Sequence, residues 1–447
     1  MYVIVVGAGE VGSYVADRLS REGVDVAVVE GDAARLRALE EELDVLTVQG
    51  SGSHPDVLEL AGLDRADLLV AVTNQDEVNM IASLVAKQHG VAQTVVRLEA
   101  AGLRSDKAAA LREVTGADLV IDPDEEAARN IVELLEFPGA SEVEALAGGE
   151  VLVIGARLDG ESPLVGRTLL EVAQEHEPNW EFLFGTITRG DDTIIPRGDQ
   201  RLEAGDQVRV LCMRRARRML MGLLGLERRI PKRVMLLGGG RTAQLVARRL
   251  SKRGTAVVIV ERDPARAREL AEGLRHVTIL EGDFTDTDVL VDGEIGSFDA
   301  VAALGGQDDA NILACLFAKS QGATETLAIA HRLELLPLLK QAGIDASLSP
   351  RTATANGVLR FVRGGIAGVA TFLEGQVEVL EFEVVAASAA AGSTVAQLGI
   401  PHDVLIGAVV RDGAAEIARG HSQLLVGDHV VVFTMPSSVG EVSKLFS

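Results

Sequence analysis

The first 136 residues alternate short apolar runs with segments whose apolar positions recur every three or four residues. The apolar runs are nearly continuous, which is typical of strands buried on both faces of a parallel sheet. The segments between them have the spacing of helices that cover such a sheet. This alternation predicts an α/β fold with a doubly wound parallel sheet. Strands are predicted at 3–6, 26–30, 45–48, 67–72, 94–98 and 119–121, and helices at 11–21, 33–42, 55–61, 78–89, 106–115 and 125–136.

The same pattern returns in the second half of the chain. Its first predicted strand is 234–237, and Pro350 opens a late helix as Pro123 does in the first half. The motif Gln75-Asp76-Glu77-Val78-Asn79 also has a counterpart, Gln307-Asp308-Asp309-Ala310-Asn311. The chain is therefore expected to contain two copies of one Rossmann-like unit.

The segments that follow each copy are richer in strands and in Gly-Asp turns. These segments, 140–225 and 372–447, also repeat each other, since the motif at 202–206 returns 222 residues later at 424–428. Their length and pattern predict small α+β domains of about 80 residues. The predicted domains are a nucleotide-binding domain at 1–138, a small domain at 139–226, a second nucleotide-binding domain at 231–368 and a second small domain at 369–447.

A glycine-rich turn joins the first strand of each copy to its first helix. The turns are Gly7-Ala8-Gly9-Glu10-Val11-Gly12 and Gly238-Gly239-Gly240-Arg241-Thr242-Ala243. The first glycine permits the tight turn, the second lets a pyrophosphate approach the backbone, and the third position packs the helix on the strand, where alanine is accepted. Because a helix N-terminus attracts phosphate, the sequence predicts two dinucleotide sites.

An acidic residue accompanies each turn at the end of the second strand. The acids are Glu30 and Glu261, and they are 231 residues apart, as the two turns are. A carboxylate at this position accepts both ribose hydroxyls of an adenosine and repels a 2′-phosphate, which favours NAD(H) or another adenosine nucleotide over NADP(H). Asp32 and Asp263 lie two residues further on and are expected to cap the next helix.

Further candidates follow the other strands, because open parallel sheets bind ligands beyond the carboxyl ends of their strands. In the first copy they are Ser51, Gly52, Thr73, Asn74 and Arg97, and in the second they are Gly282, Asp283, Gly305 and Gly306. The serine and glycine positions fit ordinary turn chemistry equally well. Arg97 follows an apolar strand and is suited to bind a phosphate or a subunit across an interface.

Composition narrows the range of functions. The formal net charge of −23 argues against general nucleic-acid binding, which requires a basic face. No apolar run reaches the roughly 18 residues of a membrane helix, and the N-terminus lacks the basic start of a signal peptide, so a cytoplasmic protein is expected. Cys212 and Cys315 have no C-x-x-C spacing and predict neither a disulfide framework nor a zinc site.

No catalytic motif accompanies the two glycine turns. The Tyr-x-x-x-Lys pair of short-chain dehydrogenases is absent, since Tyr2 and Tyr14 are followed four residues later by Val6 and Arg18. His176-Glu177 lacks the second histidine of a zinc-protease motif, and no P-loop sequence occurs. Nucleotide binding without chemistry is the favoured hypothesis. An NAD-dependent oxidoreductase is the alternative, and a nucleotide sensor of an efflux channel or another transporter is a third.

Several stretches resemble the TrkA family, whose members carry regulatory RCK (KTN) domains. The stretches are 7–12, 28–30, 50–55, 71–80, 349–356 and 359–363. The resemblance covers the whole chain, because a Rossmann-like unit followed by a small C-terminal unit, with both then repeated, is the family's layout.

The resemblance implies a non-enzymatic, cytoplasmic regulatory subunit at the inner face of the cell membrane. It implies a homotetramer whose nucleotide-binding units form a gating ring beneath a TrkH- or TrkG-like potassium transporter, with NAD(H) and ATP or ADP as ligands. The first site that it implies comprises Gly7, Ala8, Gly9, Glu10, Val11, Gly12, Glu30, Ser51, Gly52, Thr73, Asn74 and Arg97. The second comprises Gly238, Gly239, Gly240, Arg241, Thr242 and Glu261.

Overall fold

The chain forms two compact units in the computed structural model. Unit 1 comprises Met1–Glu126 and Arg351–Gly364, and unit 2 comprises Ala127–Pro350 and Gly365–Ser447. The helix predicted at 106–115 lies almost entirely outside the described residues. These are residues 1–21, 23–99, 115–178, 180–190, 192–226, 230–362, 366–371 and 377–446.

Unit 1 is built on a six-stranded parallel sheet. The strands are β1 (Tyr2–Val6), β2 (Asp25–Glu30), β3 (Leu46–Gln49), β4 (Leu68–Ala71), β5 (Gln93–Arg97) and β6 (Leu119–Ile121). Their order in the sheet is β3-β2-β1-β4-β5-β6, so the direction of winding reverses between β1 and β4. This reversal is the switch point at which doubly wound folds bind ligands.

Helices cover both faces of this sheet, because alternate residues of each buried strand point to opposite sides. Val3 and Val5 belong to one buried cluster, and Ile4 and Val6 belong to the other. The helices are α1 (Glu10–Arg21), α2 (Ala33–Glu42), α3 (Pro55–Leu60) and α4 (Asp76–Gln88), with a 3₁₀ turn, η1, at Leu63–Arg65. Apart from the helix predicted at 106–115, which lies almost entirely outside the described residues, the strands and helices predicted for this unit are confirmed, with ends shifted by at most two residues.

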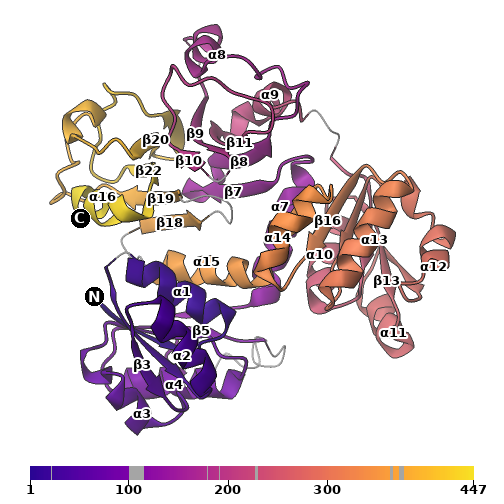
Figure 1. The fold of residues 1–447 in the computed structure, drawn as a ribbon, viewed down its shortest axis with the longest axis horizontal. Coiled ribbons are helices and arrows are strands. Elements are labelled where there is room, and N and C mark those ends of the chain that lie inside the picture. Colours follow the sequence, from indigo (N-terminus) through magenta and orange to yellow (C-terminus); the bar gives the residue numbers. More distant parts are fainter. Residues whose placement is uncertain are drawn as a thin grey trace. The chain divides into compact units, whose positions relative to one another are not determined.

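The helix that completes unit 1 comes from the second repeat. Helix α15 (Pro350–Val362) contributes Ala355, Val358, Leu359 and Val362 to the cluster that contains β1 and α1. At Gly357 an added Cβ would lie 3.5 Å from Ile121 Cδ1 of β6. Helix α15 therefore covers the first sheet, although it follows the last strand of the second (Figure 1).

Unit 2 contains the second doubly wound sheet, in the order β14-β13-β12-β15-β16-β17. Its strands are β12 (Arg233–Leu237), β13 (Ala256–Glu261), β14 (Val277–Glu281), β15 (Ala300–Ala303), β16 (Glu325–Ile329) and β17 (Ala346–Leu348). Its helices are α10 (Arg241–Lys252), α11 (Pro264–Gly273), α12 (Thr287–Asp292), α13 (Asp308–Ser320) and α14 (Leu336–Gln341), with 3₁₀ turns η5 (Ile295–Ser297) and η6 (Leu333–Leu335).

A helix of the first repeat packs with this second sheet. Helix α7 (Pro123–Glu136) contributes apolar residues to the cluster that holds β12, β13 and α10, namely Ala127, Ala128, Ile131, Val132, Leu134 and Leu135. Glu136 pairs with Arg253 at the end of α10. Pro123 and Pro350 thus open helices as predicted, but the two repeats have exchanged those helices. The boundaries of the four predicted domains remain predictions. Each predicted domain is one continuous segment, so these boundaries do not include the exchange of the two helices.

The two small domains share one topology. The first has the sheet order β10-β9-β11-β8-β7 and the second β18-β19-β22-β20-β21. Their strands are β7 (Glu142–Leu146), β8 (Val151–Arg157), β9 (Phe182–Arg189), β10 (Asp192–Ile194), β11 (Gln207–Met213), β18 (Ile366–Thr371), β19 (Glu378–Glu383), β20 (Val404–Arg411), β21 (Ala414–Ile417) and β22 (His429–Thr434). Their helices are α8 (Leu169–His176), α9 (Arg217–Leu223) and α16 (Val439–Phe446), with 3₁₀ turns η3 (Ala147–Gly149), η4 (Arg214–Ala216), η7 (Val395–Leu398) and η8 (Pro436–Ser438).

An ion pair between a buried aspartate and a partly exposed arginine explains the repeated Gly-Asp turn of these domains. Arg189 donates from Nε and Nη2 to the two carboxylate oxygens of Asp206, at 2.8 and 2.9 Å. Arg411 makes the same pair of contacts with Asp428, both at 2.7 Å. Each aspartate thus joins the end of one strand to the start of another, which accounts for the repeated motif.

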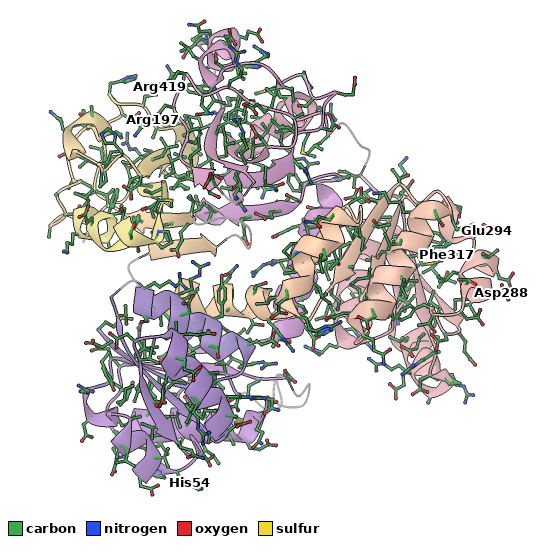
Figure 2. The ribbon with its side chains drawn as sticks, viewed as in Figure 1. His54, Arg197, Asp288, Glu294, Phe317 and Arg419 are labelled. Atoms are coloured by element: carbon green, nitrogen blue, oxygen red, sulfur yellow. The ribbon has the colours of Figure 1, made fainter. Side chains whose placement is uncertain are left out.

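The two small domains pack against each other within unit 2. Their contact contains Leu211 of β11 and Phe433 of β22, and it has no room for a side chain at Gly185, where an added Cβ would lie 2.1 Å from the Phe433 ring. At the edge, Arg197 donates to the carbonyl of His402 at 3.0 Å, and Arg419 pairs with Glu177 at 3.3 Å (Figure 2).

Among the described residues, no helix has the length and apolar character needed to cross a bilayer.

Candidate nucleotide-binding sites

The first site is a cavity of about 690 Å³ at the switch point of the unit 1 sheet. Of the residues predicted for it, Gly12 alone does not line the cavity. An added Cβ at Gly12 would lie 1.8 Å from the carbonyl oxygen of Gly7, so this position packs the helix against the turn. The predicted residues that line the cavity are Gly7, Ala8, Gly9, Glu10, Val11, Glu30, Ser51, Gly52, Thr73, Asn74 and Arg97.

Glu30 is held in place by the glycine turn itself. Its Oε2 accepts a hydrogen bond from Ala8 N at 2.7 Å, and its Oε1 accepts one from Asp32 N at 3.0 Å. The side chain is 14% exposed and lines the cavity. Asp32 caps α2 by accepting from Ala34 N at 2.8 Å, as predicted. The ribose-binding role of Glu30 stays a prediction, but its carboxylate is fixed beside the turn.

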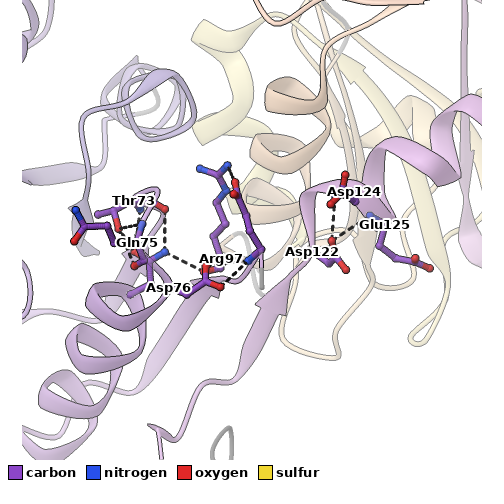
Figure 3. A network of polar contacts seen from close by, with 9 residues as sticks. Thr73, Gln75, Asp76, Arg97, Asp122, Asp124 and Glu125 are labelled. Atoms are coloured by element: carbon purple, nitrogen blue, oxygen red, sulfur yellow. Dashed lines mark hydrogen bonds and ion pairs between the residues drawn. The ribbon is translucent and has the colours of Figure 1, made fainter. Parts of the chain in front are cut away.

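A buried amide sets the spacing of the strand ends below the cavity. Asn79 Oδ1 accepts from Thr73 N at 2.9 Å, and its Nδ2 donates to the carbonyls of Thr73 and Arg97, both at 3.0 Å. Asp76 accepts from Glu99 N at 2.9 Å (Figure 3). The sequence identified this Asp-x-x-Asn motif as a repeat but assigned it no role. Its role is to tie the loops after β4 and β5 to the start of α4.

Sequence reasoning missed a cation that lines the first cavity. Arg351 lies near the start of α15, contributes to the cavity wall and pairs with Glu10 of the glycine turn. Burial lowers the pKa of the Arg351 guanidinium below its ordinary value. Pro350 gave a signal for the start of the helix, but nothing in the sequence indicated which sheet the helix would cover. Arg35, Gln75 and Val78 also line the cavity without having been predicted.

The second site is a smaller cavity, about 380 Å³, in unit 2. Gly238, Gly239, Gly240 and Glu261 line it as predicted, together with Asp283, Gly305 and Gly306, whereas Arg241, Thr242 and Gly282 do not. Phe284 also lines the second cavity, although the sequence did not predict it as a site residue. An added Cβ at Gly305 would lie 2.7 Å from the Phe284 ring.

The second site repeats the supports of the first. Glu261 accepts from Gly239 N and from Asp263 N, both at 2.8 Å. Asn311 accepts from Gly305 N at 2.9 Å and donates to the carbonyls of Gly305 and Ile329. Backbone and side-chain hydrogen bonds from Thr285 hold the pKa of Asp283 below its usual range. Arg262, which also lines this cavity, lies 3.9 Å from the Asp283 carboxylate.

These features fit an adenosine nucleotide. At Gly9 an added Cβ would meet nothing within 4 Å, which leaves the turn open to a close approach by a phosphate. The first N–H groups of α1 have no acceptor within the helix and are available to an anion.

In the part of the chain that the structure describes, no cluster of three histidine, cysteine or acidic residues could hold a metal ion. Burial raises the pKa of Cys212 and Cys315 to about 12, which disfavours thiolate chemistry.

Comparison with known families matches both repeats. The TrkA-N domain family matches residues 3–133 and 234–350, and the TrkA-C domain family matches residues 153–225 and 379–447. The chain is 35% identical to the Trk system potassium uptake protein TrkA of Halomonas elongata, over 100% of this chain and 98% of that protein. It is 34% identical to Trk system potassium uptake protein TrkA homolog 2 of Methanosarcina mazei, over the full length of both.

Solved structures share the fold. The crystal structure of the GsuK RCK domain is similar with a TM-score of 0.60 and 16% sequence identity, over 100% of this chain and 94% of that one. The GsuK channel bound to NAD is similar with a TM-score of 0.60 and 16% identity, over 99% of this chain and 78% of that one. The arrangement of two Rossmann-like domains, each followed by a small RCK C-terminal domain, is therefore that of a known architecture.

Proposed function

Because the chain belongs to the TrkA family of potassium uptake proteins, we propose that it is the nucleotide-sensing regulatory subunit of a Trk-type potassium uptake system. The observation that carries the proposal is the first cavity. There a glycine turn, a fixed carboxylate and the start of a helix surround an open space at the switch point of the sheet. These are features for holding a nucleotide, and they suit binding without chemistry.

The proposed ligands are NAD(H) and ATP or ADP. In the first site, Glu30 would accept the ribose hydroxyls, and the turn from Gly7 to Val11 would hold phosphate. In the second site, Glu261 and the turn from Gly238 to Gly240 would do the same in a smaller space. Structures of the similar GsuK channel bound to NAD and to ADP support nucleotides of both kinds.

The proposed partner is a TrkH- or TrkG-like membrane subunit at the inner face of the cell membrane. Four copies of the chain would form a ring on this partner, and nucleotide binding would favour one ring geometry over another. The energy available for gating is the difference in nucleotide affinity between the two geometries, not the affinity itself. A mass in solution near four times 47.2 kDa would support the tetramer, whereas a monomer at all concentrations would contradict it.

The decisive experiment measures potassium flux into vesicles that contain the membrane subunit. Flux is recorded without this protein, with it, and with it plus NADH, NAD, ATP or ADP. We expect the protein to alter flux and at least one nucleotide to change that effect. The double variant Glu30→Gln, Glu261→Gln is the control, because it should still join the complex but lose the response to nucleotide. Flux that is insensitive to every nucleotide would refute the regulatory role.

The NAD-dependent oxidoreductase remains the competing hypothesis. It predicts consumption of NADH at 340 nm when a suitable carbonyl substrate is added, whereas the regulatory hypothesis predicts binding without turnover. Its weakness is that neither described cavity combines a glycine turn with a tyrosine, histidine or lysine for proton transfer.

A further inference from the structure

The first cavity has a wall that the second repeat supplies. Arg351 stands on α15, whose residues Ala355, Val358 and Leu359 are buried in the core of unit 1. Its guanidinium pairs with Glu10 in the glycine turn, and both residues line the cavity. The Arg351 side chain is 33% exposed and the Glu10 side chain 46%, so the pair stands at the edge of the open space.

The ion pair between Arg351 and Glu10 is unfavourable for phosphate binding as it stands. A carboxylate next to the turn repels a bound phosphate, while a guanidinium attracts it and forms paired hydrogen bonds with its oxygens. Arg97 also lines the cavity. Its Nη2 pairs with Glu99, whereas its buried Nε has no hydrogen-bond partner among the described residues. Three arginines, Arg35, Arg97 and Arg351, thus line the cavity beside a turn whose N–H groups suit an anion.

We propose that Arg351 binds a phosphate of the nucleotide in the first site and exchanges its partner Glu10 for that phosphate. This inference rests on the proposed function, since it requires a nucleotide there. Arg351 is then a specificity residue that favours nucleotides with terminal phosphates. A terminal phosphate carries about −1.5 to −2 charges at neutral pH, more than each phosphate of a dinucleotide carries. The residue also makes occupancy of the first site depend on a helix from the second half.

The second repeat has the opposite charges at the matching sequence positions. Arg241 stands where the first glycine turn has Glu10, and Asp124 follows Pro123 where Arg351 follows Pro350. The second site therefore has no counterpart of Arg351 at this position of its exchanged helix. The two sites should accordingly differ in how strongly a terminal phosphate adds to affinity.

The test is calorimetric titration of the full chain with ADP, NADH and adenosine. All variants carry Glu261→Gln so that binding at the first site dominates the signal. Arg351→Gln is expected to lower ADP affinity about ten- to a hundredfold, NADH affinity less, and adenosine affinity not at all. Arg351→Lys should restore part of the loss by keeping the charge.

Glu10→Gln should raise ADP affinity, and this gain should shrink when Arg351 is also replaced. Arg37→Gln, an exposed position on α2 outside the cavity, is the matched control.

The outcomes separate this inference from the proposed function. If neither ADP nor NADH binds the unmodified chain, the proposed function fails, and this inference fails with it. If both bind and Arg351→Gln changes nothing, only the role of Arg351 is refuted. Equal losses for ADP and adenosine would show that the substitution merely loosens α15, which also overturns the inference. Amide hydrogen exchange in β1 and α15 monitors that loosening directly.

Discussion

At the scale of single residues, the two acids Glu30 and Glu261 have a structural function that is visible in the structure, and ribose binding is the function proposed for them. Each accepts a hydrogen bond from its own glycine turn and a second from the backbone two residues further on. The carboxylate is therefore oriented before any ligand arrives. Preorganisation of this kind reduces the entropy lost on binding.

Glu30→Gln should reduce the preference of the first site for NADH over NADPH. The amide loses a charge-assisted acceptor for the ribose, which costs about 1.5–3 kcal/mol, and it no longer repels a 2′-phosphate. NADH affinity should fall about tenfold or more, while NADPH affinity should hold or rise. Fluorescence titration of both dinucleotides measures the ratio, with Glu261→Gln as the matched variant in the second site. An unchanged ratio would remove Glu30 from the ribose contact.

Asp206→Asn should destabilise the first small domain in a pH-dependent manner. Asp206 is 1% exposed, and although burial alone would raise its pKa, hydrogen bonds from Arg189 and from Glu203 N lower it below the ordinary value of 3.8. The stabilisation is therefore complete above pH 3.8 and is lost as the pH falls through the lower folded pKa. At pH 7 the free energy of unfolding should fall by about 1–3 kcal/mol, because charge-assisted hydrogen bonds of a buried carboxylate are lost, while the partner Arg189 is 41% exposed.

Urea unfolding followed by Trp180 fluorescence measures this effect, since Trp180 is the only tryptophan of the chain and lies in the same domain. The difference between the unmodified chain and Asp206→Asn should shrink between pH 4 and pH 2. Asp199→Asn, at an exposed position of the same domain, should cost little at any pH. A difference that stays constant with pH would contradict the assignment.

At the scale of elements, the Asp-x-x-Asn motif connects helix starts to strand ends. Asn79→Asp keeps the oxygen that accepts from Thr73 but places a second oxygen opposite the carbonyls of Thr73 and Arg97. The buried donor is lost, so the unfolding free energy should fall by about 1–3 kcal/mol, and nucleotide affinity at the first site should fall with it. Gln88→Glu, exposed on the same helix, serves as the control. If Asn79→Asp weakened only the second site, the proposed connection would be wrong.

The sequence predicted these elements well where burial fixes them. Strands such as β1 and β12 are apolar runs because both faces are covered, and Glu30 and Glu261 are recognisable by their spacing from the glycine turns. Arg351 was not predictable, because it reaches its cavity through α15 and not through its neighbours in sequence. The helices α7 and α15 have apolar faces that suit either of two similar sheets. Only the packed structure determines which sheet each helix covers.

At the scale of the whole molecule, the exchange of α7 and α15 makes each sheet depend on the other repeat. Leu359→Ala should remove a fully buried side chain of α15 and cost about 2–5 kcal/mol. The loss should appear as faster amide hydrogen exchange in β1 and β2, although residue 359 belongs to the second repeat. Leu135→Ala on α7 is the reciprocal variant and should affect β12 and β13. The assignment of the two helices would be refuted if Leu359→Ala increased amide hydrogen exchange in β12 and β13 instead, and Leu135→Ala did so in β1 and β2.

The exchanged helix also has a consequence for how the protein is made. The ribosome releases the strands of the first sheet early, and α7 follows them directly in the sequence. Helix α15, which covers one face of that sheet, is translated some 225 residues after α7. At about 5–20 residues per second, that apolar face waits roughly ten to forty-five seconds for its helix. During synthesis the nascent chain therefore carries an uncovered hydrophobic surface, and during this interval chaperones, or a neighbouring nascent copy, would have access to it.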